Sequence, residues 1–263
     1  MKPSVVSSLI ERVMPLAQDA VISDVRLGLG YSAIQLDHGG VGVCWSPKST
    51  GHACTVFESA GTLVGRKAAE VIPWLGHTDI PWHRAIGLAA LNAVLNHDTP
   101  PVAETVDIIT QLALQKHDRV AMVGCFRPLL KSIRSNGCHL DIIELEPSIP
   151  DSLTPKEGVQ ALQTCTVAIL TGTSLVTGTL DDLLNDISTA REKPRAVVLL
   201  GPSVPLIPEA FQGTPITYIA GSWVRDGKRV LQVVSEGGGT PQLKPSLISM
   251  TLCVLPTSSH AKV

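Results

Sequence analysis

The sequence predicts an α+β domain over residues 1–100, followed by a Rossmann-like α/β domain over residues 101–263 with a mostly parallel sheet. The second half contains five short apolar runs, rich in β-branched residues, at intervals of 20 to 29 residues. Such strands, with room for one helix and two loops between them, are typical of a parallel sheet that helices cover on both faces. In the first half, apolar residues alternate with polar ones between glycines, which favours antiparallel strands.

The first hundred residues begin with an expected helix, because Val6, Leu9, Ile10, Val13, Met14 and Ala17 fall on one helical face. Residues 21–43 alternate in polarity and are interrupted by glycines at 28, 30, 39 and 40, which predicts two or three antiparallel strands. Residues 64–74 and 82–97 predict two further helices. The cluster Asp98-Thr99-Pro100-Pro101 marks the expected domain boundary.

The strands of the second half are expected near residues 120–124, 140–144, 167–170, 196–200 and 216–220. Because right-handed crossovers connect such strands, they should be neighbours and mostly parallel. The helices between them also have signatures. Thr179 and Asp182 have the spacing of a capping box, and the leucines and isoleucine that follow repeat at helical spacing: Leu180, Leu183, Leu184 and Ile187.

The composition excludes several classes of protein. Of 263 residues, 44% are hydrophobic and 17% charged, and the net charge is −2, so the chain is not disordered. Basic residues are not clustered, which argues against a nucleic-acid partner. The longest uncharged stretch, residues 158–180, holds six threonines and predicts a strand and a turn, so membrane insertion is not expected. Without a signal-peptide core, the cytoplasm is the expected location. The oligomeric state stays open, and a homo-oligomer is compatible with the sequence.

Six cysteines occur without a C-x-x-C motif, so we expect free and mostly buried thiols. Four candidate metal ligands lie within 17 residues in the first domain: His38, Cys44, His52 and Cys54. Their spacing matches no standard zinc pattern. Cys125 is better placed, since it follows an expected strand and precedes a helix, whose N-terminus should lower the pKa of the thiol. The other histidines are expected to be solvated surface residues.

Asn92 is the only polar side chain in the segment from residue 85 to residue 95. A helix that is apolar on every face is buried, and a buried amide needs partners. Two alternatives remain open: Asn92 binds the backbone of a neighbouring loop, or it lines a cleft and holds a ligand.

Polar and small residues follow each expected strand of the second half, at the edge where α/β sheets bind ligands. Glycine stands at four of these strand ends, Gly124, Gly172, Gly201 and Gly221, where bare backbone N–H groups could approach an anion. Glu144 lies 20 residues after Gly124, where a dinucleotide fold places its ribose-binding acid. The motif G-x-G-x-x-G is absent, however, so NAD and FAD are not expected as cofactors. No complete catalytic constellation is present.

Eight segments, taken together and in order, resemble the DUF364 family with an N-terminal DUF4213 domain, whose members are described as heavy-metal chelation proteins. The segments are Gly28-Leu29-Gly30-Tyr31-Ser32-Ala33, Ile86 to Ala93, Gly124-Cys125-Phe126, Thr171-Gly172-Thr173, Thr179-Leu180, Leu200-Gly201-Pro202-Ser203, Ala220-Gly221 with Asp226, and Gly237-Gly238-Gly239. The resemblance implies an enolase-N-terminal-like domain before the Rossmann-like domain and a site in the cleft between them. Arg127 and Thr177 depart from the family pattern, where proline and asparagine are expected.

The resemblance and the residues together favour a protein that holds a metal ion, or a metal bound to a small organic chelator, in the interdomain cleft. The alternative is an enzyme that acts on a small polar or nucleotide-like substrate in the same cleft. The candidate ligand-binding residues are Gly30, Tyr31, Asn92, Gly124, Phe126, Arg127, Glu144, Thr171, Gly172, Thr173, Gly201, Ser203 and Gly221; the candidate metal ligands are His52, Cys54 and Cys125. We prefer the chelated metal, because no three soft ligands share a recognisable spacing.

Overall fold

A three-stranded antiparallel sheet forms the centre of the N-terminal half. The computed structural model describes residues 4–48, 57–77, 79–97, 99–100, 107–146 and 149–255. The strands are β1 (Ile22–Leu27), β2 (Tyr31–Leu36) and β3 (Val41–Trp45), in that spatial order. All three pair antiparallel, as the alternating polarity of residues 21–43 predicts.

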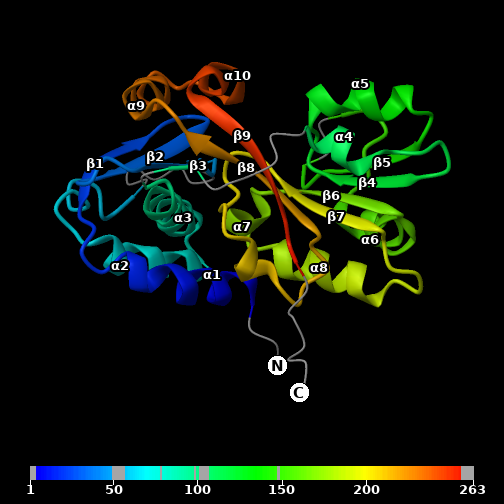
Figure 1. Ribbon diagram of the computed structural model, residues 1–263, viewed down its shortest axis with the longest axis horizontal. Helices are drawn as coiled ribbons and strands as arrows, with labels where there is room; N and C mark the ends of the chain where they lie inside the picture. Colours follow the sequence, from blue (N-terminus) through cyan, green and yellow to red (C-terminus); the bar gives the residue numbers. More distant parts are fainter. Residues whose placement is uncertain are drawn as a thin grey trace.

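Both faces of this small sheet are covered. The apolar helix α3 (Pro81–Leu95) packs on one face, and α9 (Gly227–Ser235), from the far end of the chain, packs on the other. Side chains alternate accordingly: Ile34 and Leu36 join the core beneath α3, whereas Ala33 and Val43 pack with residues of α9. Figure 1 shows the sheet between these two helical layers. A helix from the second half of the chain therefore covers one face of the sheet in the first half.

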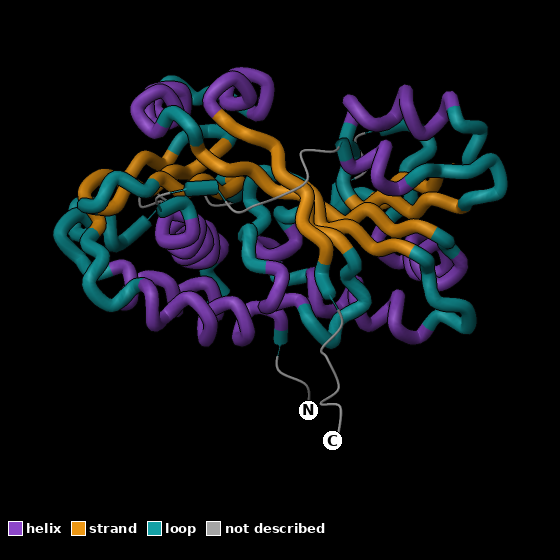
Figure 2. Tube along the Cα trace, in the orientation of Figure 1, coloured by secondary structure: helices purple, strands orange, loops and turns teal. Residues whose placement is uncertain are grey.

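The C-terminal half is built on a six-stranded sheet in the order β5-β4-β6-β7-β8-β9. Its strands are β4 (Arg119–Val123), β5 (His139–Ile143), β6 (Val167–Thr171), β7 (Ala196–Leu200), β8 (Tyr218–Val224) and β9 (Leu247–Cys253). The first five are adjacent and parallel, which confirms the prediction from strand spacing. The sequence did not predict β9, which pairs antiparallel with β8. These two long antiparallel strands cross the middle of the molecule (Figure 2).

Helices cover both faces of the parallel sheet, as its apolar strands require. One face carries α4 (Ile108–Leu112) and α5 (Arg127–Ser135); the other carries α6 (Pro155–Thr164) and α8 (Leu180–Thr189). The remaining elements are α1 (Val5–Val13), η1 (Met14–Leu16), α2 (Ala68–Val71), η2 (Ile72–Gly76), α7 (Ser174–Thr177), η3 (Pro208–Phe211), α10 (Thr240–Leu243) and η4 (Lys244–Ser246). Helix α8 does begin after Thr179, but the expected capping box is wrong, because the Thr179 side chain makes no capping hydrogen bond. Its hydroxyl pairs with that of Thr177 instead.

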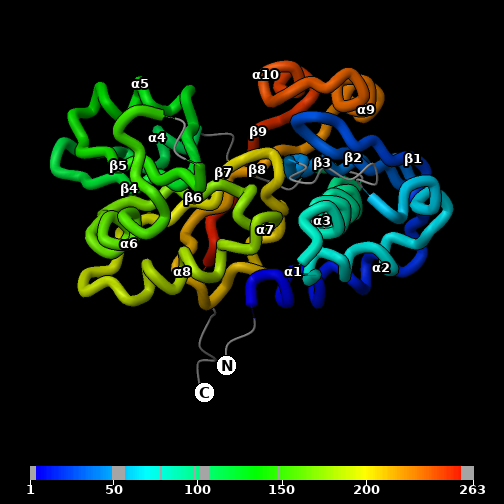
Figure 3. Tube along the Cα trace, turned by 180° about the vertical axis from the view of Figure 1, so that it is seen from behind, coloured from blue at the N-terminus to red at the C-terminus, as the bar shows by residue number. Residues whose placement is uncertain are grey.

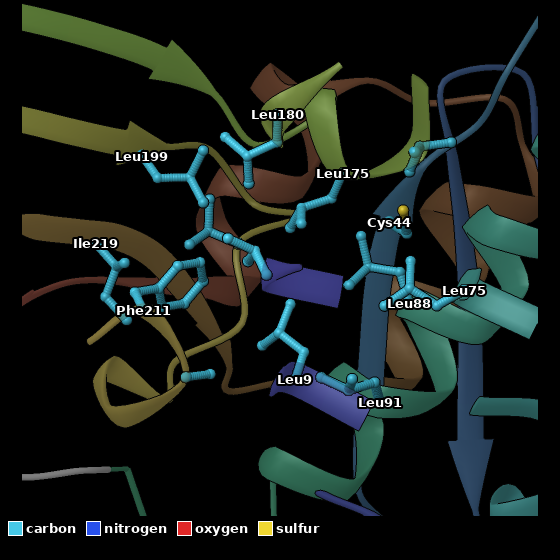
Figure 4. Packing of buried hydrophobic residues seen from close by; sticks show 14 of the residues in the cluster. Leu9, Cys44, Leu75, Leu88, Leu91, Leu175, Leu180, Leu199, Phe211 and Ile219 are labelled. Carbon is cyan, nitrogen blue, oxygen red and sulfur yellow. The ribbon is translucent and has the colours of Figure 1, made fainter. Parts of the chain in front are cut away.

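One hydrophobic core extends through both halves of the molecule. Leu9 of α1 and Leu88 of α3 belong to the same buried cluster as Leu175 of α7, Leu199 of β7 and Phe211 of η3. Figure 4 shows these side chains from the two halves side by side. The two halves are therefore packed against each other by apolar contact. The boundary near residue 100 stays a prediction.

Candidate functional site

The carboxyl edge of the parallel sheet faces the N-terminal half. The loop after β7 reaches β3, where the Ser203 hydroxyl accepts a hydrogen bond of 2.9 Å from the Trp45 N–H. The turn after β6 continues into α7, whose Leu175 carbonyl accepts a hydrogen bond of 2.9 Å from the buried guanidinium of Arg84 on α3. Figures 1 and 3 both place α7 between α3 and the sheet. We call this junction, from Trp45, Arg84 and Asn92 to Leu175 and Ser203, the seam.

Asn92 holds the two halves together at the seam. Its Nδ2 donates to the Val43 carbonyl at 2.9 Å and to the Ser203 carbonyl at 3.2 Å. The half-buried side chain thus donates both amide protons to backbone carbonyls. This agrees with the first alternative for Asn92, in which it binds the backbone of a neighbouring loop. Its Oδ1 accepts no hydrogen bond from any described residue, so one acceptor remains for a ligand. The structure supports a connecting role and leaves the ligand role as a prediction.

A second group of polar residues lies at the ends of β5, β4 and β6. Glu144 accepts a hydrogen bond of 2.8 Å from the Cys125 N–H through Oε1, which fixes the carboxylate against the turn after β4. Its Oε2 has no hydrogen-bond partner among the described residues. At the end of β6, the hydroxyls of Thr171 and Thr173 lie 3.0 Å apart. Gly124 lies between Glu144 and Thr171, and its backbone is close to the threonine: a Cβ at Gly124 would lie 3.0 Å from the Thr171 Cβ. We call Gly124, Cys125, Glu144, Thr171 and Thr173 the edge group.

The strand-end glycines do not present N–H groups to a ligand, and this corrects the sequence expectation. The N–H of Gly124 donates to the Ile143 carbonyl, that of Gly172 to the Leu200 carbonyl, and that of Gly201 to the Ala220 carbonyl. These bonds continue the pairing of the parallel strands beyond their ends. Glycine is required for other reasons: Gly124 and Gly201 have positive φ of 83° and 130°, which other residues rarely adopt. The edge therefore offers side-chain oxygens rather than backbone donors.

Several predicted site residues lie away from the edge group. Tyr31 points to the opposite face of the N-terminal sheet, where its buried hydroxyl lies 2.8 Å from the Thr240 hydroxyl of α10. Burial there raises the pKa of the phenol. Phe126 packs on the core beneath α5, and Arg127 is exposed at the first residue of that helix. Gly221 is buried against Leu206. Gly30 lies in the turn before β2, on the side of Gly238.

The two departures from the family pattern have local explanations. Arg127 starts α5 and is followed by Pro128, so proline is present one residue later than expected. Thr177 ends α7 and directs its hydroxyl to the Thr173 carbonyl at 3.4 Å and to the Thr179 hydroxyl at 3.0 Å. The threonine therefore holds the turn between α7 and α8.

The expected soft metal ligands do not come together among the described residues, where no group of three or more His, Cys, Asp or Glu could hold a metal. Cys44 is fully buried under α3, and burial strongly raises the pKa of its thiol. Burial and the charge of Glu144 also raise the pKa of the Cys125 thiol, although Arg127 and Arg134 oppose them. This reverses the expectation that a helix N-terminus activates Cys125. His52 and Cys54 lie outside the described residues.

The cysteines described by the structure are free, as predicted: Cys44, Cys125, Cys138, Cys165 and Cys253. Among these five described cysteines, only Cys44 and Cys165 are buried, so the expectation of mostly buried thiols is wrong for the other three. No helix in the described part of the chain is long and apolar enough to cross a membrane.

A cavity of about 330 Å³ lies at the opposite, amino edge of the parallel sheet, far from the predicted residues. Its lining includes Asp118, Thr166, Lys193 and Arg195. These groups satisfy one another or neighbouring carbonyls: Arg195 binds Asp118 through Nε and Nη2, and Lys193 donates to the carbonyls of Ser188 and Ala190. These four lining groups therefore already have structural partners.

Two residues that join the halves were missed by sequence reasoning. Arg84 immediately precedes the apolar segment of α3 and is therefore a charged residue near the beginning of a buried helix. Its side chain is buried, and a Cβ at Gly178 would collide with its guanidinium, so glycine makes room for it. Asn96, at the other end of α3, exchanges two hydrogen bonds with the backbone of Val224 in β8. Charged or amide residues at the two ends of an apolar helix were the available signal.

Comparison with known proteins agrees with this architecture. The DUF364 family model matches residues 107–253 and the DUF4213 model matches residues 10–95, both with the description "Putative heavy-metal chelation". The chain belongs to the DUF364 family and carries a DUF4213 domain in front of it. An uncharacterized protein of Methanocaldococcus jannaschii is 26% identical over 243 residues, which span 86% of this chain and 89% of that protein.

Two solved structures of DUF364 proteins of unknown function have the same fold. The protein from Pyrococcus horikoshii has a TM-score of 0.81 at 21% identity, covering 95% of this chain and 100% of its own. The protein from Desulfitobacterium hafniense has a TM-score of 0.77 at 22% identity, covering 95% and 96%. At these identities, the likeness shows the fold alone.

Replacing Asn92 with leucine should lower the free energy of unfolding by about 1–3 kcal/mol, because the carbonyls of Val43 and Ser203 would lose their donor. Chemical denaturation of the two proteins measures the difference. Asn136→Ala is the control, since Asn136 lies exposed at the end of α5. Unchanged stability in Asn92→Leu would show that Asn92 does not connect the halves.

Proposed function

We propose that this protein binds a metal ion carried by a small organic chelator, held in a cleft between the edge group and the seam. The observation that carries the proposal is a set of oxygen acceptors there that have no hydrogen-bond partner among the described residues. Glu144 is fixed through Oε1, and both its Oε2 and the Oδ1 of Asn92 lack a partner in that part of the chain. The hydroxyls of Thr171 and Thr173 add groups that both donate and accept.

The chemistry of these groups favours a chelate over a bare soft ion. Thiolate and imidazole are the ligands of soft and borderline metals, whereas the edge group supplies one thiol whose pKa is raised. A metal already wrapped in an organic ligand needs instead hydrogen bonds and one or two charges. The family description of heavy-metal chelation supports the metal part of the proposal.

The alternative is an enzyme acting on a small polar or nucleotide-like substrate at the same place. One observation favours it: Glu144 follows β5, which pairs with β4, so the carboxylate lies beside the first βα turn of the parallel sheet. Dinucleotide folds place their ribose-binding acid at the corresponding position. The free Oε2 of Glu144 would then accept a hydrogen bond from a sugar hydroxyl.

Thermal unfolding with defined probes tests the proposal. Zn²⁺, Ni²⁺ and Cu²⁺ are added as free ions and as citrate complexes, with citrate alone as the control. A complex at about 100 times its Kd should stabilise the protein by about 2.7 kcal/mol, and the free ions should have little effect. Glu144→Gln should remove the stabilisation, whereas Glu146→Gln, an exposed neighbour, should keep it.

A tight one-to-one complex with a free ion that Cys125→Ser abolishes would contradict the proposal, because the thiol would then be the ligand. Stabilisation by adenosine in the absence of metal, lost in Glu144→Gln, would favour the enzyme alternative.

A further inference from the structure

Two histidines of the N-terminal half form a pair that the proposed function does not use. His77 directly follows η2 and His83 lies in the first turn of α3, and their Nδ1 atoms are 3.0 Å apart. The sequence predicted both as solvated surface residues. In the structure they face each other, so that prediction is wrong in one respect: the rings have a specific partner although they reach solvent.

The Nδ1 atoms of the two rings face each other at hydrogen-bond distance. The ring centroids are 5.2 Å apart and the Nδ1 atoms are 3.0 Å apart. The difference between these two distances is close to twice the distance from the centre of an imidazole ring to one of its nitrogens, so each Nδ1 lies almost on the line between the two centroids. The Nδ1 lone-pair axes therefore point at each other nearly in line. In the metal-free pair, one ring carries a proton on Nδ1 and donates it to the other. Such opposed lone pairs do not converge on a tetrahedral or octahedral centre.

Aromatic rings surround the pair. The Trp74 ring lies 4.6 Å from the His83 ring, tilted by 31°, and lies stacked 6.5 Å from the His77 ring. Phe57 meets His83 edge-on at 5.6 Å. A cation between the histidines would thus be close to a tryptophan face, whose quadrupole attracts positive charge.

We propose that His77 and His83 form a site for a soft monovalent metal ion such as Cu⁺. The ion would be two-coordinate and linear, bound between the two Nδ1 atoms. Metal–imidazole bonds of about 2.0–2.1 Å would place the two nitrogens about 4 Å apart, so the rings need to separate by roughly 1 Å. The ring that carries a proton on Nδ1 moves it to its own Nε2 through solvent. Both rings stay neutral, and no net proton is released.

The site is independent of the edge group. It selects a two-coordinate ion because the described residues bring no third thiolate, imidazole or carboxylate to it. Zn²⁺ and Ni²⁺ require more ligands and different angles, so they should bind this pair much more weakly than a linear monovalent ion.

Silver ion is the probe, because Ag⁺ is a redox-stable stand-in for Cu⁺. The protein is labelled with ¹⁵N-histidine, and its accessible thiols are alkylated first, since thiolates also bind Ag⁺. At one equivalent, the ring ¹⁵N signals of His77 and His83 should shift together. His77→Ala and His83→Ala should each abolish the shift of the remaining partner, whereas the exposed control His117→Ala should leave both shifts intact.

Wild-type signals that do not move, or a histidine that still responds after its partner is removed, would overturn the proposal. The spectrum of the wild-type protein decides the first outcome even if a variant folds poorly. Glu144→Gln should leave the response unchanged, so the failure of the chelate proposal and the failure of this site are distinguishable.

Discussion

Replacing Asp118 with alanine should lower the free energy of unfolding by about 3 kcal/mol, because Arg195, the Thr166 hydroxyl and the Gln115 N–H all lose their shared acceptor. The Asp118 side chain is 1% exposed. It accepts hydrogen bonds from Arg195 at 2.7 and 3.1 Å, from the Thr166 hydroxyl at 2.6 Å and from the Gln115 N–H at 2.8 Å. One carboxylate thus holds together the starts of β4, β6 and β7. Urea denaturation measures the loss.

The matched control is Asp24→Ala, which removes the pair of Asp24 with Arg26 in β1. That pair is more exposed, so its loss should cost no more than about 1 kcal/mol. Equal losses in the two variants would contradict the role assigned to Asp118.

The contribution of Asp118 should also depend on pH. The Arg195 hydrogen bonds hold the pKa of the carboxyl far below its usual range, with Thr166 and Gln115 helping. A group whose pKa is depressed by folding stabilises the protein above its unfolded pKa, about 3.9, and loses that effect as the pH falls towards the folded value. The stability difference between wild type and Asp118→Ala should therefore be full at neutral pH and shrink below about pH 4.

Replacing Gly42 with valine should cost roughly 3 kcal/mol or more and disturb the seam. Gly42 lies in β3 directly under α3, where a Cβ would overlap the backbone of Ala89 and Ala93 and lie 2.6 Å from the Asn92 carbonyl carbon. Since those atoms belong to a helix backbone, the strand and the helix would have to separate. Denaturation and the amide spectrum of the seam residues would show both effects.

Gly76→Ala is the control for Gly42→Val, because the nearest atom to a Cβ there is Ile10 Cδ1 at 3.8 Å. It should change stability by no more than about 0.5 kcal/mol. If Gly42→Val were tolerated equally well, the close packing of α3 on β3 would not be a constraint.

The strand order could be predicted because parallel strands have a strong local signal. Runs such as Val197 to Leu200 are apolar on both faces and are separated by one helix each. Strand β9 has a weaker signal. Its burial depends on antiparallel pairing with β8, and its alternate residues are only half-buried or exposed, so it lacks a continuous apolar run.

The composition of the site could be predicted only in part. Residues at the ends of neighbouring parallel strands meet by topology, which is why Gly124, Glu144 and Thr171 were brought together as expected. The position of Tyr31 could not be foreseen in this way. Its face of β2 is covered by α9 and α10, which come from the other half of the chain. The N–H groups of the strand-end glycines donate hydrogen bonds to carbonyls of neighbouring strands. These hydrogen bonds could not be predicted, because they depend on how the strands pair beyond their ends.

Native mass spectrometry of the purified protein, with elemental analysis of the same sample, tests whether the protein carries a chelated metal. We expect one metal ion per chain together with a small organic mass, both retained in Asp24→Ala and both lost in Glu144→Ala. A metal bound without any organic mass, or a complex that is equally populated in Glu144→Ala, would contradict it.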